Sequence, residues 1–66
     1  MPNPFLVSQI EFLSMMALLE KADEYEKLIE LVSRYRNSTS VLVIQYVRAA
    51  LVEILAEIER RGKSNG

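Results

Sequence analysis

Asn37-Ser38-Thr39-Ser40, NSTS in one-letter code, is the one polar run between two long stretches with apolar patterning. Asparagine tolerates the left-handed conformation that ends a helix, and a Ser or Thr hydroxyl can cap the helix that follows. Neither stretch contains a helix breaker, because no glycine or proline lies between Pro4 and Gly62. The sequence therefore predicts an all-α fold, a hairpin of two long antiparallel helices joined by a tight turn at 37–40.

The second helix is predicted over about 40–61. Gly62 follows Glu59-Arg60-Arg61 and is typical of a helix end, since glycine adopts the left-handed cap and cations suit the negative end of the helix dipole. Residues 62–66 are then expected to form a disordered tail of a single domain spanning 1–66. The apolar residues of the helix recur at spacings of three and four, as one helical face requires: Ile44, Val47, Leu51, Ile54, Leu55 and Ile58.

The first helix is predicted over about 4–36. Asn3-Pro4 is typical of a helix start, because asparagine caps free amides and proline at the first helical position loses no hydrogen bond. Further along, a heptad seam crosses residues 20–23 without a change of phase, which favours one continuous helix. The seam consists of Met15, Leu18, Ala22, Tyr25, Ile29 and Val32.

Two ways of burying the first arm remain open. A helix of about 33 residues is about 50 Å long and one of about 22 residues about 33 Å, so residues 5–15 would project beyond the second helix. This arm is apolar on nearly every side, and such a helix needs cover. A second copy would cover it in a dimeric four-helix bundle, the favoured assembly. A break near 21–23, where Asp23 and Glu26 have the spacing of a capping box, would instead give a monomeric three-helix bundle.

Size and composition also favour self-association. The chain has 66 residues, of which 50% are hydrophobic, and no cysteine. A single core of fewer than about 70–80 residues rarely leaves more than about 3–5 kcal/mol of stability, and surplus apolar side chains usually mark an interface. An apolar groove of the dimer could also accept another protein. The expected self-association interface comprises Phe5, Leu6, Ile10, Phe12, Leu13, Met16, Ala17, Leu51, Leu55 and Ile58.

No residue pattern predicts catalysis, a cofactor or a metal site. Histidine and cysteine are both absent. Glu53 and Glu57 lie one helical turn apart, but carboxylate di-metal sites in bundles add a Glu-x-x-His motif. The serines have no candidate general base beside them. We therefore expect a non-enzymatic interaction or structural protein.

The basic residues support an alternative function. A net charge of −1 does not match a dedicated nucleic-acid binder. A dimer would double each basic cluster, however, so a small nucleic-acid-associated regulator is the alternative. Its contacts would come from two clusters at the predicted helix ends: Arg34, Arg36, Arg60, Arg61 and Lys63.

Arg48 is the only charged residue between Asn37 and Glu53. Its stem could lie over apolar neighbours on an exposed face. It could alternatively pair with an acidic residue of a partner helix and fix the register of the assembly.

The chain is expected to be cytoplasmic. Residues 1–19 lack the basic region of a secretion signal and carry Glu11. Residues 41–58 are apolar-rich but interrupted by charges, whereas a spanning helix needs about 20 residues with few or none. A surface-bound membrane helix is disfavoured too, because residues 4–19 contain no Lys or Arg.

Overall fold

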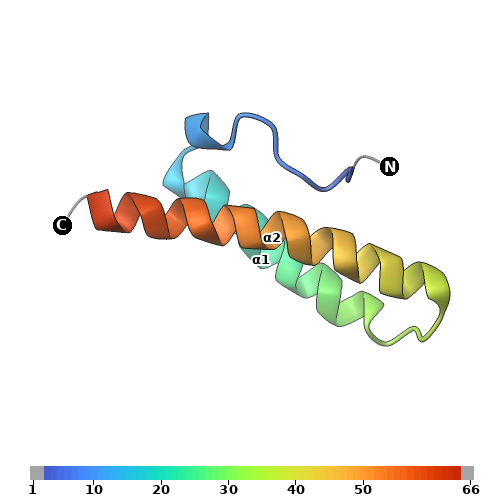
Figure 1. Ribbon diagram of the computed structural model, residues 1–66. Helices are drawn as coiled ribbons and strands as arrows, with labels where there is room; N and C mark the ends of the chain where they lie inside the picture. Colours follow the sequence, from blue (N-terminus) through green and yellow to red (C-terminus); the bar gives the residue numbers. More distant parts are fainter. Residues whose placement is uncertain (1–2, 65–66) are drawn as a thin grey trace.

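The computed structural model describes residues 3–64 as a helical hairpin with a folded-back N-terminal segment (Figure 1). The elements are the short 3-10 helix η1 (Ile10–Phe12), α1 (Met15–Val32) and α2 (Ser38–Ser64). The two long helices pack against each other, and no strand occurs within the described residues. The prediction of an all-α hairpin is confirmed.

The first helix begins at Met15, so the predicted start at residue 4 is wrong. Ser14 caps α1: its hydroxyl accepts a hydrogen bond from the Ala17 amide at 3.1 Å. The helix then continues through residues 21–23, and Asp23 forms an ion pair with Lys27 at 3.0 Å. The predicted continuity of the seam is confirmed, and the alternative break with a capping box at Asp23 is wrong.

The turn lies where the sequence predicts it, but the residues that end α1 and cap α2 differ from the predicted ones. The helix α1 ends at Val32, before the predicted 36. The Asn37 side-chain oxygen accepts a hydrogen bond from the Ser40 amide at 2.8 Å, so Asn37 caps α2. The sequence also allows Asn37 to end the first helix in the left-handed conformation. That alternative is wrong, because Gln9 is the only non-glycine residue with positive φ in the described part.

The second helix passes through Gly62 and continues to Ser64, so the predicted end at 61 is too early. A Cβ at Gly62 would meet no atom within 4 Å, and its backbone is helical. Residues 62–64 of the predicted tail are therefore helical, while residues 65 and 66 lie outside the described part.

Residues 3–13, here called the strap, fold back along the hairpin rather than extending α1 (Figure 1). At its start, the side-chain amide of Asn3 donates to the Tyr46 carbonyl at 2.8 Å. Two residues on, the Phe5 carbonyl accepts a hydrogen bond from the Tyr25 hydroxyl at 2.5 Å, and the two rings meet edge to face with their centroids 6.0 Å apart. At its end, Arg61 donates to the Ile10 carbonyl at 3.3 Å. The strap is thus tied to both helices.

This course reverses the predicted mismatch of lengths. At 1.5 Å per residue, α1 is about 27 Å long and α2 about 40 Å, so α2 extends beyond α1. The prediction that residues 5–15 project as a helix is wrong. The physical reason is burial, because the strap packs four of its apolar side chains against the hairpin core, namely Phe5, Val7, Ile10 and Leu13.

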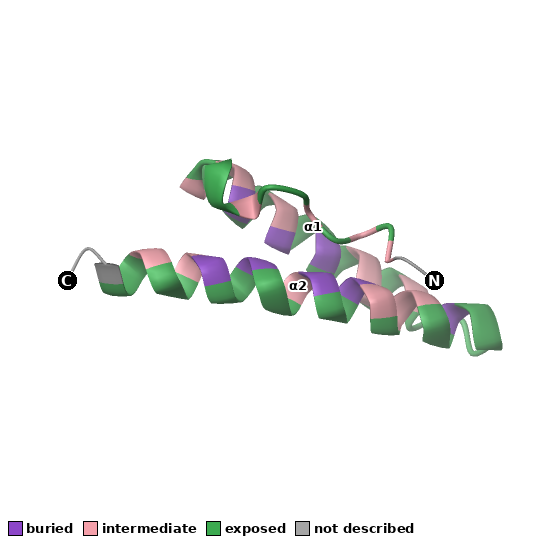
Figure 2. Cartoon of the chain, turned by 45° about the horizontal axis from the view of Figure 1, so that its top comes forward, coloured by how far each residue is buried: buried purple, intermediate pink, exposed green. Residues whose placement is uncertain are grey.

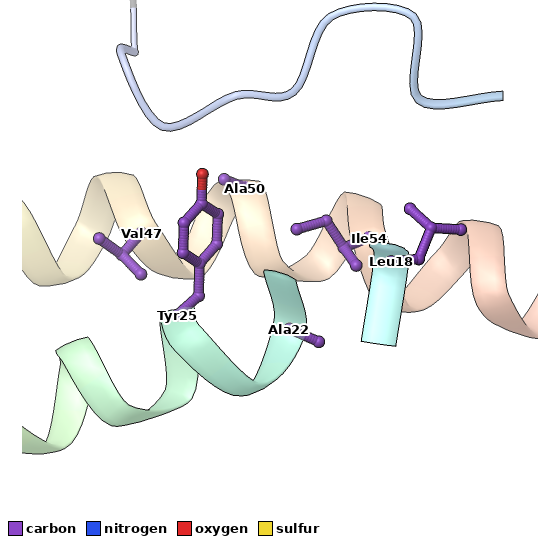
Figure 3. Packing of buried hydrophobic residues seen from close by; sticks show 6 residues of the cluster. All are labelled: Leu18, Ala22, Tyr25, Val47, Ala50 and Ile54. Carbon is purple, nitrogen blue, oxygen red and sulfur yellow. The ribbon is translucent and has the colours of Figure 1, made fainter. Parts of the chain in front are cut away.

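The core lies between the facing sides of α1 and α2 (Figure 2). Figure 3 shows Tyr25 beside Val47 and Ala50, and Leu18 near Ile54. The core between the two helices is thin, since the Cα trace measures only 43 × 23 × 15 Å. The buried apolar set is Leu18, Ala22, Tyr25, Val47, Ala50 and Ile54.

Candidate functional site

The strap covers one side of the hairpin. On α2 it hydrogen-bonds Tyr46, the residue directly before the buried Val47. On α1, strap residue Leu13 lines a surface hollow together with residues that directly precede buried positions, among them Ala17 and Lys21. On both helices, the strap therefore covers the side that carries the residues directly before each core residue.

The residues directly after each core position lie on the opposite side. One residue turns a helix by about 100°, and in two antiparallel helices that face each other the same turn leads to the same side of the pair. We call this side the open face. On α2 it is a row with alternating spacings of three and four: Val41, Ile44, Arg48, Leu51, Leu55 and Ile58. On α1 it comprises Leu19, Asp23, Glu26 and Glu30.

The open face is apolar on α2 and mostly acidic on α1. Val41 and Leu55 are 54% and 45% exposed, and Leu19 is 53% exposed. Within residues 3–64, neither Glu26 nor Arg48 takes part in an ion pair or side-chain hydrogen bond. A heptad row with one unpaired charge at its middle is the pattern of a helix that packs against a further helix.

The structure separates the predicted interface residues into two groups. Five are partly buried against the core of their own chain: Phe5, Ile10, Leu13, Leu51 and Ile58. Four are exposed, namely Leu6, Phe12, Met16 and Leu55, and Ala17 is half-buried. Leu51, Leu55 and Ile58 share the open face, whereas the strap residues among the ten do not lie in that row.

Glu57 fastens the strap to the end of α2, a role that sequence reasoning missed. It is only 8% exposed, and it accepts hydrogen bonds from Arg60 at 3.1 Å and from Arg61 at 2.8 Å. Arg61 also donates to the carbonyls of Ile10 and Glu11, so the carboxylate orients the arginine that holds the strap. The sequence does contain a signal for the burial of Glu57, because Glu57 follows the core residue Ile54 at the helical spacing of three.

These hydrogen bonds hold the pKa of Glu57 below its ordinary value of 4.5. The bond from Arg60 contributes most and the bond from Arg61 next, and together they outweigh the opposite effect of burial. The carboxylate is therefore charged near neutral pH and paired with two cations. We call Glu57, Arg60 and Arg61 the clasp.

The basic residues considered for nucleic-acid contacts are divided between the two ends of the hairpin. Arg60 and Arg61 belong to the clasp, and Lys63 forms an ion pair with Glu59 at 3.3 Å. Arg34 and Arg36 are exposed in the turn between the helices. Acidic neighbours thus offset the cluster at the end of α2.

Other chemical sites are sparse. The surface hollow beside Leu13 is lined mainly by charged side chains: Glu20, Lys21 and Glu24. Within residues 3–64 no group of three or more Asp or Glu side chains is arranged to hold a metal ion. No helix in that range combines the length and apolar character needed to cross a bilayer. Comparison with protein families, curated proteins and solved structures finds no match to the chain.

Proposed function

We propose that this chain is a non-enzymatic, cytoplasmic interaction module that works as a homodimer, with two hairpins packed into a four-helix bundle. The open face of α2 carries the proposal. Val41 and Leu55 expose apolar area there, and the partly buried Ile44, Leu51 and Ile58 lie in the same row, which only Arg48 interrupts. A second copy of this chain would remove that row from water.

The surface area of the chain supports the same assembly. Its accessible surface is 5073 Å² for a mass of 7.6 kDa. A folded monomer of this mass is expected to expose about 4,300 Å². The difference of about 800 Å² equals roughly what one partner buries in a standard-size protein interface. Burial of about 800 Å² per chain would lower the exposed area of each chain to that expected for a monomer of its mass.

Sedimentation equilibrium at micromolar concentration tests the proposal. The expected result is a species of twice 7.6 kDa. Leu55→Glu places a charge on the open face and is expected to shift the equilibrium toward the monomer, because an unpaired charge would enter the contact. Ala49→Glu is the matched control: Ala49 is exposed on the same helix and turned by about 120° from Leu55.

The two variants separate association from folding. Helical circular dichroism should be unchanged in both, since both positions are exposed. A wild-type chain that stays at 7.6 kDa up to about 100 µM would refute the homodimer. Equal association of Leu55→Glu and wild type would remove the open face from the interface.

A further inference from the structure

We infer that the two copies stack with α1 of each on α2 of the other, so that Glu26 lies against the partner's Arg48 in two symmetric ion pairs. This inference rests on the proposed homodimer and adds its arrangement. It starts from Glu26 and Arg48, two charged residues of the open face that have no ion pair within the described chain.

Glu26 and Arg48 lie at similar heights along the hairpin, about one residue's rise on either side of the Tyr25–Val47 level. Figure 3 shows Tyr25 beside Val47. Glu26 directly follows Tyr25 and Arg48 directly follows Val47, so both turn to the open face at this level. Arg48 also lies near the middle of the α2 row, which runs from Val41 to Ile58.

Two symmetric ways of stacking the open faces are possible. A two-fold axis parallel to the helices places α1 on the partner's α2 and keeps every residue at its own height. A two-fold axis across the helices places α1 on the partner's α1 and α2 on the partner's α2. With the faces fully overlapped, the second arrangement brings Arg48 near the partner's Arg48 and Glu26 near the partner's Glu26.

Charge complementarity selects the first arrangement. It joins each Glu26 to an Arg48 of opposite sign, whereas the second joins like charges in a contact from which water is excluded. The acidic row of α1 also continues with Glu30 and with Asp23, which is paired with Lys27 of its own helix, while Arg48 is the one charged residue of the α2 row. An α1-on-α2 contact therefore sets acidic side chains against the only cation in the interface.

One pair of apolar side chains fits the same arrangement. Leu18 lies near Ile54 in the core (Figure 3), so Leu19 and Leu55 lie at similar heights on the open face. Leu19 of one copy then packs against the partner's Leu55. Both are about half exposed in the single chain, at 53% and 45%. The dimer thus contains two Leu19–Leu55 contacts and two Glu26–Arg48 ion pairs, one of each on either side of the two-fold axis.

Charge reversal tests the arrangement. Glu26→Arg and Arg48→Glu are each expected to raise the dimer dissociation constant about tenfold or more, since each creates two like-charge contacts. Mixing the two variants should restore association, because both contacts of the mixed dimer are again of opposite sign. The doubly reversed chain should associate as wild type does. Glu24→Arg and Arg34→Glu are matched controls, since they change the charge equally away from the open face.

The outcomes separate this inference from the proposed function. A monomeric wild-type chain overturns the proposed function and the arrangement together. A dimeric wild type whose association is unchanged in Glu26→Arg and Arg48→Glu leaves the homodimer standing and overturns the arrangement. Sedimentation velocity of the mixture, with one variant fluorescently labelled, provides the readout.

Discussion

At the scale of single residues, the clasp couples a buried carboxylate to the position of the strap. Without partners, the buried charge of Glu57 would lower the stability of the fold, because burial of an unpaired charge is unfavourable. Arg60 and Arg61 provide the partners, and Arg61 passes the constraint to the carbonyls of Ile10 and Glu11. The strap is therefore held by a group that titrates in acid.

The clasp predicts acid sensitivity of the fold. The pKa of Glu57 is lowered in the folded chain, so the unfolded chain binds the proton at higher pH than the folded chain does. The resulting stabilisation is complete above the ordinary pKa of 4.5 and is lost as the pH falls through the lowered folded-state pKa. Glu57→Gln should therefore lower the free energy of unfolding at pH 7 and flatten its decline in acid. Urea unfolding at a series of pH values measures both.

Glu53→Gln is the control for this acid series. Glu53 is exposed on α2, one turn before Glu57, and has no described ion pair. It should keep the wild-type stability and acid dependence. If Glu57→Gln retained the full acid dependence as well, the clasp would not be its source.

Some residue roles were ambiguous in the sequence for a physical reason. An asparagine side chain accepts backbone amide hydrogen bonds both in a helix cap and in an Asx turn. Asn3 accepts from the Phe5 amide at 2.9 Å in a turn, whereas Asn37 accepts from the Ser40 amide at the start of a helix. Contacts with α2 decide between the two outcomes, and a single sequence does not contain them.

At the scale of elements, the two helices could be predicted and the strap could not. The seam of α1 and the row of α2 repeat with helical spacing over several turns, which is the strongest signal a sequence carries. The strap instead alternates along its extended part: Phe5 and Val7 are half-buried, while Leu6 and Ser8 are exposed. Because Leu6 is apolar too, the alternation is hidden in the sequence. The open face could likewise not be predicted. Its residues can be read from the sequence, but only the position of the strap shows which side of the hairpin is covered.

The cap of α2 gives the test at this scale. Asn37→Ala removes the side-chain oxygen that accepts from the Ser40 amide, and loss of such a cap costs about 1 kcal/mol of stability. Thr39→Ala changes an exposed residue of the same turn for which no hydrogen bond from the side chain is described. Chemical denaturation should place the midpoint of Asn37→Ala below those of Thr39→Ala and wild type. An equal loss of stability in both variants would contradict a specific role of Asn37 and would assign the cap to residues 37–40 as a whole.

At the scale of the whole molecule, the thinness of the chain supports the proposed pairing of two copies. The shortest dimension of the Cα trace is 15 Å, and the core is one side chain deep between two helices. The strap adds cover on one side, and the apolar row of α2 lies on the other. A chain of 66 residues without cysteine has few other means of gaining stability. Folding and pairing should therefore be linked.

This linkage predicts that the melting temperature depends on protein concentration. A reaction that releases two unfolded chains from one folded dimer is opposed by mass action, and a hundredfold rise in concentration contributes about 2.7 kcal/mol per dimer. For a domain of this size the shift should be roughly 5–10 °C, measured by circular dichroism between about 1 and 100 µM. Leu55→Glu should melt at one temperature across this range, because a monomer unfolds without a change in particle number. A wild-type melting temperature that stays constant across the same range would show that the hairpin with its strap is stable as a single chain.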